Sequence, residues 1–425
     1  MDRIKIVGGK SLSGKIKISG AKNSVLPIMA AAIMTPDLVL LENVPNLMDV
    51  KTMSELIKHL GTEVREVCSS GTLSIKAQNI TTCEAPYDIV RKMRASILVL
   101  GPLLARFGKA IVSIPGGCAI GTRPVDMHLD ALAQMGARIE IDQGNIIASV
   151  EGKLRGTKIN FKTVSVGATE NIVMAACLAE GVTILTNAAC EPEVVDLCNF
   201  LNKMGAKIEG IGSKEITITG VDELHGCSYN IIPDRIEAAT YLIAGAITRG
   251  DIEITDVIPV HLQSVTDKLR EMGISIIVRE DSIYLDARYC EFKTVDISTG
   301  VYPGIPTDVQ AQFMALMTIV VGKSNIQENL FENRFMHVAE LIRMGADIEY
   351  HDRVAIVSGV KKLKAAPVMA TDLRASVSLI IAALAAEGES FIHRVYHLDR
   401  GYESIEKKLS MCGADIVREK AVVLV

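Results

Sequence analysis

The sequence has few of the features that mark nucleic-acid-binding proteins. It contains no tryptophan and only 4% aromatic residues, so a base-stacking surface is not expected. Its 45 Lys and Arg residues nearly balance 50 Asp and Glu residues, and a net charge of -5 gives no positive field that would hold a polyanion. We therefore expect no nucleic-acid partner.

Signals for membranes and secretion are also missing. The longest apolar runs, such as Val377 to Ala386, stop far short of the roughly 20 residues that a membrane span requires. Residues 1–9 become charged within the first three positions and contain no apolar core of signal-peptide length. Nine scattered cysteines without a CxxC pair are typical of reduced thiols. These absences predict a soluble, cytoplasmic protein with no membrane partner.

Motifs of metal sites and of nucleotide hydrolysis are absent as well. The eight histidines show neither HExxH nor another paired ligand spacing. The segment IVGGKSLSGK falls short of the GxxxxGK[ST] spacing of a phosphate-binding loop. We expect no metal and no cofactor.

Present instead is a sixfold repeat, in a chain whose 425 residues and 49% hydrophobic content suffice for two or three domains. A helix end, a glycine and a short strand recur six times, at intervals of 75, 69, 68, 72 and 68 residues. The glycines are Gly61, Gly136, Gly205, Gly273, Gly345 and Gly413. Each is expected to adopt the left-handed conformation that ends a helix without a Cβ clash.

The residues around each glycine predict a unit of helix, strand, helix, strand and strand. In the third copy we expect helices over 169–178 and 193–204, and strands over 182–185, 207–209 and 215–219. The first helix of each unit is apolar on nearly all sides, as in VMAACLA, and so belongs in an interior. The predicted fold class is α/β, with three units around central apolar helices in each of two globules that divide near Ile232 and Pro233.

Polar residues at the N-terminal ends of these buried helices need an explanation, because an unpaired buried charge is costly. Some are explained by capping, since Thr307 with Gln310 and Asp234 with Glu237 have capping-box spacing. Three others are cations, which oppose the helix dipole unless an anion is bound there, namely Lys22, Arg94 and Arg374.

A second group of polar residues falls in the loop before the outer helix of each unit. In the second unit this loop grows into PGGCAIGTRPVDMH, residues 115–128, and its three glycines predict flexibility. Most cysteines in such a chain are packing thiols, but Cys118 lies in this loop five residues before Arg123, whose charge favours the thiolate. Corresponding loops supply Glu191, Arg334 and Arg400, so we expect charges from different units to converge where the two globules meet.

These residues resemble those of the enolpyruvyl transferases over essentially the whole chain. The motifs that carry the resemblance are SGAKN, MRAS, PGGCAIGTRPVDMH, SVGAT, PTDVQAQF, FENRFMH, ATDLRAS and DRGYE. The cysteine loop is similar to that of the branch that acts on UDP-N-acetylglucosamine, and the branch that acts on shikimate 3-phosphate lacks it. The resemblance implies two inside-out α/β domains, each of three βαβαββ units around central apolar helices. They would comprise residues 22–232, and residues 1–21 with 233–425, with the active site in the cleft between them.

The resemblance also implies two small-molecule substrates, phosphoenolpyruvate and UDP-N-acetylglucosamine. Lys22, Arg123 and Arg400 would hold the phosphate of phosphoenolpyruvate. Arg334 and Arg374 would hold its carboxylate, because guanidinium groups match both anions.

For the nucleotide sugar, the resemblance implies contacts from both domains. Asn23 would lie near the reacting carbon and the sugar. The other implied contacts are Arg94, Arg123, Pro124, Val125, Asp126, Met127, Thr163, Val164, Ser165, Val166, Asp308 and Leu330. Relatives often carry Lys where Thr163 stands, so the neighbouring Lys162 is an alternative contact to the diphosphate.

The implied reaction transfers the enolpyruvyl group to the sugar 3-hydroxyl and releases phosphate. Asp308 would remove the hydroxyl proton, and Cys118 would protonate the methylene carbon, with a covalent thiol adduct as an alternative. Because Asp308 starts a helix among arginines, it would be a weak base until the domains close around the substrates. Transfer to 3-phosphoshikimate and a catalytically silent ligand-binding relative remain open, and nothing in the sequence indicates the oligomeric state.

Overall fold

Six four-stranded sheets of one common order run through the described residues, which are 2–67, 71–115 and 125–420 of a computed structural model. In each sheet a lead strand pairs in parallel with a second strand, and two antiparallel strands follow. Three sheets belong to a first domain, residues 20–115 and 125–232, and three to a second domain, residues 2–19 and 233–420.

The sheets of the first domain are, in spatial order, β14 (Ser228–Asn230), β3 (Leu38–Glu42), β5 (Thr72–Lys76) and β4 (Glu63–Val67); β6 (Glu84–Ala85), β7 (Lys109–Ser113), β9 (Asn145–Ser149) and β8 (Arg138–Asp142); and β10 (Lys158–Asn160), β11 (Val182–Thr186), β13 (Glu215–Thr219) and β12 (Lys207–Glu209). Those of the second domain are β2 (Ser13–Lys17), β15 (Asp251–Thr255), β17 (Ser282–Asp286) and β16 (Ser275–Val278); β18 (Ile297–Ser298), β19 (Lys323–Gln327), β21 (Val354–Ser358) and β20 (Asp347–His351); and β22 (Pro367–Met369), β23 (Glu389–His393), β1 (Asp2–Val7) and β24 (Asp415–Lys420).

Each repeat adds an inner and an outer helix to its sheet. The inner helices are α1 (Lys22–Ala31), α4 (Leu100–Phe107), α6 (Val166–Cys177), α8 (Arg235–Ile247), α10 (Gln310–Met317) and α12 (Leu373–Ala385). The outer helices are α2 (Met48–His59), α5 (Asp126–Gln134), α7 (Pro192–Lys203), α9 (Gln263–Glu271), α11 (Val338–Arg343) and α13 (Ile405–Met411). The shorter helical segments are α3 (Tyr87–Val90), η1 (Ala32–Met34), η2 (Arg94–Val99), η3 (Pro259–Leu262), η4 (Thr307–Val309) and η5 (Val395–Arg400).

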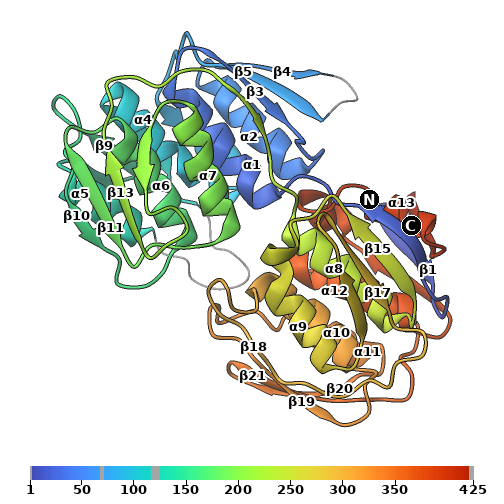
Figure 1. The fold of residues 1–425 in the computed structure, drawn as a ribbon. Coiled ribbons are helices and arrows are strands. Elements are labelled where there is room, and N and C mark those ends of the chain that lie inside the picture. Colours follow the sequence, from blue (N-terminus) through green and yellow to red (C-terminus); the bar gives the residue numbers. More distant parts are fainter. Residues whose placement is uncertain (1, 68–70, 116–124, 421–425) are drawn as a thin grey trace. The chain divides into compact units, whose positions relative to one another are not determined.

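The inner helices are buried, as their all-round apolar sequences predict. Figure 1 shows α8, α10 and α12 at the centre of the second domain, with strands around them. Each domain has its own core of aliphatic residues, alanine and methionine. Among the described residues, no helix is long and apolar enough to cross a membrane.

The six glycines that organise the repeat all adopt positive φ values, between 88° at Gly345 and 106° at Gly61, which confirms their predicted role at helix ends. The third repeat also follows the prediction closely. Both strands after its glycine have the expected bounds, 207–209 and 215–219, and its inner helix starts three residues before the expected position 169.

Two details of the sequence interpretation were wrong. The residues around the glycines gave a unit without its lead strand, because strands of two to five residues such as β6 and β10 carry too little pattern to be recognised. The capping box of Thr307 does not form: Pro306 occupies the N-cap position, and the Thr307 hydroxyl donates to Glu328 instead. Asp234 does cap its helix, accepting from the backbone N–H groups of Ile236 and Glu237.

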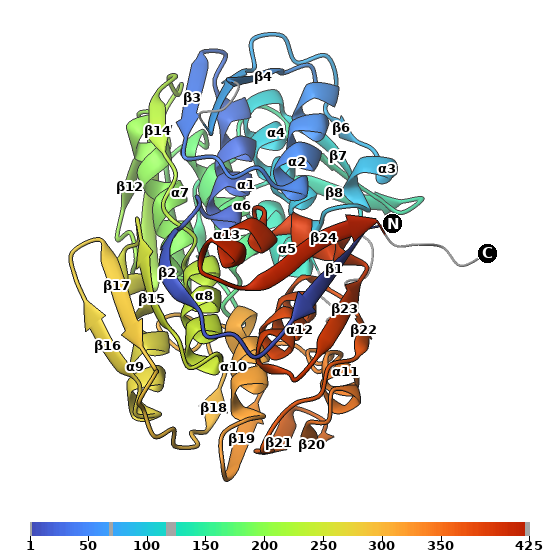
Figure 2. The same cartoon turned by 90° about the vertical axis from the view of Figure 1, so that its right-hand side faces the viewer.

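The N-terminal strands complete the second domain. β1 lies between β23 and β24 and pairs antiparallel with both, and β2 pairs in parallel with β15. β14, from the end of the third repeat, in turn supplies the lead strand of the first sheet. Figure 2 shows β1 between its two partners. Each domain is therefore closed by strands that lie far apart in sequence.

Candidate functional site

In the second domain, one carboxylate lies between two arginines from distant parts of the sequence. Nη2 of Arg334 lies 2.5 Å from Oδ1 of Asp308, and Nη2 of Arg374 lies 3.0 Å from Oδ2. The two arginine side chains are 5% and 7% exposed, and that of Asp308 is 26% exposed. Each carboxylate oxygen thus has its own guanidinium partner, and the three groups together carry one positive charge, the arrangement that favours an incoming anion.

Three different elements supply these side chains. Asp308 lies in η4, directly before the buried helix α10. Arg374 is the second residue of α12, whose N-cap Asp372 accepts from the backbone N–H groups of Arg374 and Ala375. Arg334 lies between β19 and α11. The anion that a cation at a helix start requires is therefore supplied by the chain itself, as the carboxylate of Asp308.

A buried hydrogen-bond network fixes this cluster from behind. The hydroxyl of Tyr402 lies 3.3 Å from Nη1 of Arg374 and 2.9 Å from the hydroxyl of Thr240. Nε2 of Gln312 donates to Thr240 and, at 2.8 Å, to the backbone carbonyl of Asp308. Burial by itself lowers the pKa of Arg374, but the charges of Asp308, Tyr402 and Asp234 and the hydrogen bond to Asp308 together outweigh it and raise that pKa. Arg374 is thus a permanently charged and well-oriented group.

Glu328 links the turn of Asp308 to the loop that carries Leu330. Its carboxylate is buried and accepts hydrogen bonds from the hydroxyls of Thr299 and Thr307 at 3.0 and 2.8 Å. It also accepts from the backbone N–H groups of Leu330 and Phe331. Because one carboxylate binds both segments, it fixes the position of the turn that carries Asp308 relative to the loop that carries Leu330.

Arg400 is the last residue of η5 in the same domain and is half-buried. The pKa of His397 is lowered mainly by burial and, to a smaller extent, by the nearby positive charge of Arg400.

In the first domain, Lys22 opens α1 and faces a carboxylate from α2. Its Nζ lies 3.3 Å from Oδ2 of Asp49, and the two side chains are 13% and 4% exposed. Here too, a cation at the start of a buried helix is paired with an acid of the chain. Asn23 follows on α1 and is half-buried.

The segments expected to contact the nucleotide sugar meet at the starts of α5 and α6. The hydroxyl of Thr163 lies 3.5 Å from the sulfur of Met127 and joins the two segments. Ser165 is the N-cap of α6, and its hydroxyl accepts from the N–H of Ala168 at 3.3 Å. Ser165 therefore has a structural role in addition to the one expected for it. The other expected contacts of these segments in the described residues are Val125, Asp126, Val164 and Val166, and Arg94 opens η2 of the same domain.

Cys118, Arg123 and Pro124 lie outside the described residues. Their roles remain predictions.

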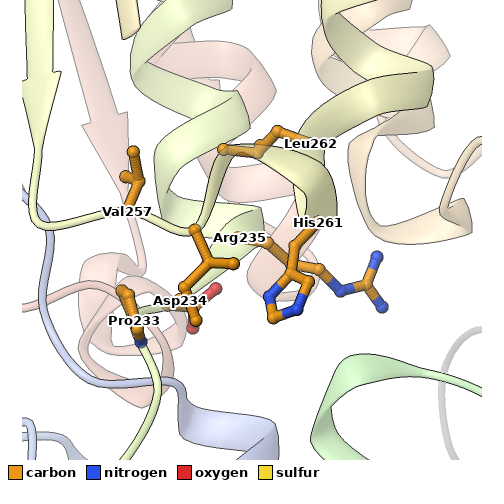
Figure 3. Close-up of a pocket in the computed structure, with 7 residues that line it drawn as sticks. Pro233, Asp234, Arg235, Val257, His261 and Leu262 are labelled. Carbon is orange, nitrogen blue, oxygen red and sulfur yellow. The ribbon is translucent and has the colours of Figure 1, made fainter. Parts of the chain in front are cut away.

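Two hollows in the surface do not coincide with the expected site residues. One lies at the start of α8 in the second domain, where Figure 3 shows Pro233, Asp234, Arg235 and His261 among the residues around it. Its empty space, open solvent included, is about 160 Å³, less than the several hundred Å³ that a nucleotide sugar requires. The other, in the first domain, is a wider hollow lined by residues such as Arg106 and Lys153 and contains none of the expected site residues.

Sequence reasoning did not single out Asp49, Tyr402 or Glu328. Tyr402 lies inside the DRGYE motif, and Glu328 closely precedes FENRFMH, so nearness to a motif was the available signal. Asp49 carries no such signal, because its partner Lys22 lies 27 residues away and the pairing depends on how α1 packs on α2.

Comparisons with known proteins identify the family of the chain. The profile of the family described as EPSP synthase (3-phosphoshikimate 1-carboxyvinyltransferase) matches residues 6–409. The UDP-N-acetylglucosamine 1-carboxyvinyltransferase of Paramagnetospirillum magneticum is 55% identical, covering 99% of both chains. The protein of that name from Granulibacter bethesdensis is 57% identical, covering 98% of this chain and 99% of its own.

Solved structures give the same result. The enolpyruvyl transferase NikO from Streptomyces tendae superposes with a TM-score of 0.88 at 26% identity over 99% of both chains. An EPSP synthase from Acinetobacter baumannii, at 17% identity, shares the fold with a TM-score of 0.75 over 99% of this chain and 100% of its own. This chain therefore belongs to the enolpyruvyl (carboxyvinyl) transferase family, and within it to the group of UDP-N-acetylglucosamine 1-carboxyvinyltransferases.

Proposed function

We propose that the chain transfers the enolpyruvyl group of phosphoenolpyruvate to the 3-hydroxyl of UDP-N-acetylglucosamine and releases phosphate, a step of peptidoglycan precursor synthesis. The observation that carries the proposal is the pair of buried arginines, Arg334 and Arg374, around Asp308. Such a pair offers two guanidinium groups to a carboxylate next to an acid that can accept a proton. The names of relatives at 55% and 57% identity supply the acceptor.

Each substrate anion has a set of proposed partners. The carboxylate of phosphoenolpyruvate binds Arg334 and Arg374, and its phosphate binds Lys22, Arg123 and Arg400. All five side chains are of cationic types, which suits a substrate with two anionic groups.

For the nucleotide sugar, the proposed contacts are Asn23, Arg94, residues 123–127, residues 163–166, Asp308 and Leu330. The short contact between Thr163 and Met127 supports a common surface for the second and third of these segments.

The proposed chemistry is addition followed by elimination. Asp308 removes the proton of the 3-hydroxyl as the oxygen attacks C2 of phosphoenolpyruvate, and Cys118 delivers a proton to C3. The C2–O bond to phosphate then breaks with its electron pair on phosphate, and C3 returns a proton to the Cys118 thiolate, which restores the double bond and the thiol. The hydroxyl proton taken by Asp308 leaves with the phosphate. A carbon–oxygen bond to the sugar has replaced the one to phosphate, and no oxidant or metal is needed for the balance.

The reaction uses groups of both domains, so substrate binding is proposed to bring them together and to exclude water from the reacting atoms. Small-angle scattering should then register compaction when UDP-N-acetylglucosamine is added. An unchanged radius of gyration at saturating nucleotide sugar would remove this part of the proposal.

Phosphate release tests the proposed reaction directly. We expect release from phosphoenolpyruvate with UDP-N-acetylglucosamine and none with shikimate 3-phosphate. Phosphate release only with shikimate 3-phosphate would assign the chain to the branch that acts on that substrate. Binding of the nucleotide sugar without phosphate release would identify a catalytically silent relative.

The reactive thiol can be tested independently. An epoxide mimic of phosphoenolpyruvate should label Cys118, and faster when the nucleotide sugar is present. Cys83 is a suitable reference because burial raises the pKa of its thiol, which slows alkylation. Equal labelling of both residues would contradict a special role for Cys118. All seven described cysteines are free, which fits the reducing cytoplasm that we propose as the location.

A further inference from the structure

One buried amide joins three elements of the first domain. Asn171 lies on α6 and is fully buried. Its Oδ1 accepts from the backbone N–H of Gly101 on α4 at 2.6 Å, and its Nδ2 donates to the carbonyl of Ile97 in η2 at 3.0 Å. The same Nδ2 lies 3.0 Å from Nδ1 of His128 on α5. A Cβ at Gly101 would lie 2.4 Å from Oδ1 of Asn171, so this close approach requires glycine.

These contacts determine the state of the imidazole. The N–H of Gly101 and the carbonyl of Ile97 fix which end of the Asn171 amide is oxygen and which is nitrogen. An amide NH₂ group can only donate, so Nδ1 of His128 must accept, and the ring proton must lie on Nε2. A proton on Nδ1 would place two donors opposite each other.

The fold itself does not require a polar residue at this position. Asn171 lies 11 residues before Val182, the first residue of strand β11. The residues at the same distance before β3 and β7, in the other two repeats of this domain, are Pro27 and Leu98. Pro27 lies in α1 and Leu98 in η2, the segment before α4, so the fold accepts apolar residues at this position and the amide has to be explained by what it joins.

Of the four elements that meet at this amide, three begin at a proposed contact to the nucleotide sugar, and the fourth, α4, directly follows η2. η2 begins at Arg94, α5 begins at Asp126, and α6 begins at Val166. We propose that Asn171 and His128 are positioning residues for the nucleotide sugar, which hold the starts of η2, α5 and α6 in the arrangement that binds it. The proposal rests on the proposed function for the identity of the ligand, whereas the hydrogen-bond network stands independently of it.

The charge around the imidazole is consistent with this role. Burial, followed by the nearby charge of Arg94, lowers the pKa of His128 to about 4. His128 is 6% exposed and packs through α5 against α6. It is therefore neutral at working pH, as the acceptor at Nδ1 requires.

The test separates positioning from stability. Asn171→Leu introduces the residue of the second repeat, and we expect KM for UDP-N-acetylglucosamine to rise at least tenfold while kcat changes less than threefold. His128→Asn keeps an acceptor near the position of Nδ1 and should raise KM less than His128→Phe does. Ile75→Ala, at a fully buried position of strand β5 in the same domain, is the control for lost stability.

A spectroscopic measurement tests the geometry directly. In the full-length wild-type chain, nitrogen-15 NMR should find His128 with its proton on Nε2 from pH 7.5 down to about pH 5, and Asn171→Leu should admit a measurable share of the form protonated on Nδ1. A proton on Nδ1 in the wild type overturns the proposal, as does Asn171→Leu lowering stability like Ile75→Ala without changing KM. If the wild type binds the nucleotide sugar but releases no phosphate, the proposed function fails, and the dissociation constant for UDP-N-acetylglucosamine replaces KM as the readout.

Discussion

Asp308→Asn is the most informative single substitution in this chain. In the absence of substrate, Asp308 occupies the two guanidinium groups that are proposed to bind the carboxylate of phosphoenolpyruvate. The substrate carboxylate must therefore compete with Asp308 for the same donors. Displacement would also release Asp308 from its ion pairs, so the arrival of the substrate would make it a better base.

The expected effects on turnover and on anion binding have opposite signs. Loss of a general base should reduce kcat by about 10² to 10⁴. Binding of 2-phosphoglycolate, an unreactive anion with one carboxylate and one phosphate, should strengthen about tenfold. This corresponds to about 1.4 kcal/mol, the lower range for a hydrogen bond to a charged group that no longer has to be broken.

Stability should respond to the same anion. In Asp308→Asn without the anion, the two buried arginines have lost the carboxylate that they share, which lowers the free energy of unfolding by about 3 kcal/mol. Added 2-phosphoglycolate should restore part of this loss, measured as a larger rise in melting temperature for Asp308→Asn than for the wild type.

Glu419→Gln is the matched control. Glu419 lies on β24 and pairs with Arg3 in the same domain at 2.6 Å, outside the proposed site. Its loss should lower stability without strengthening anion binding. Near-normal turnover of Asp308→Asn would refute the role of Asp308 as base, and unchanged or weaker binding of 2-phosphoglycolate would refute the competition.

Three further predictions concern residues around the site. His128 and His337 are buried with pKa values lowered to about 4, so the unfolded chain takes up protons below about pH 6.5 that the folded chain does not. The free energy of unfolding should therefore fall between pH 6.5 and 4 by about 3 kcal/mol for each histidine. In urea denaturation, the free energy of unfolding of His337→Gln should fall less over this pH range than that of the wild type. A difference between wild type and His337→Gln that does not vary with pH would contradict this. The two carboxylate oxygens of Glu328 together accept four hydrogen bonds, and Glu328→Gln replaces one of these oxygens by an NH₂ donor. KM for the nucleotide sugar should therefore rise severalfold in steady-state assays, and an unchanged KM would exclude the positioning role of Glu328. Asp49→Asn removes a carboxylate that competes with the substrate phosphate for Lys22, so by the same reasoning as for Asp308 it should mainly lower KM for phosphoenolpyruvate, whereas an effect on the nucleotide sugar alone would show that Lys22 serves the other substrate.

The sequence alone determined the repeating architecture, because the signals involved are local. A glycine that ends a helix needs positive φ whatever surrounds it, and a helix without a polar face is buried in any fold that contains it. The six glycines and the buried inner helices were predictable for this reason. Family motifs placed Asp308, Arg334 and Arg374 among the proposed site residues before any distance was known.

Only the tertiary structure decided how these residues are paired. The sequence indicated that Lys22 and Arg374 needed an anion but not that Asp49 and Asp308 provide it, since each pair is separated by tens of residues and meets through helix packing. The short lead strands were missed for a related reason: they are stabilised by hydrogen bonds to a partner strand rather than by a pattern of their own. The role of Asn171 depends likewise on three elements whose meeting no local pattern encodes. Local conformation follows from the neighbouring residues, whereas the partner of a buried charge or amide is fixed only when distant segments have packed together.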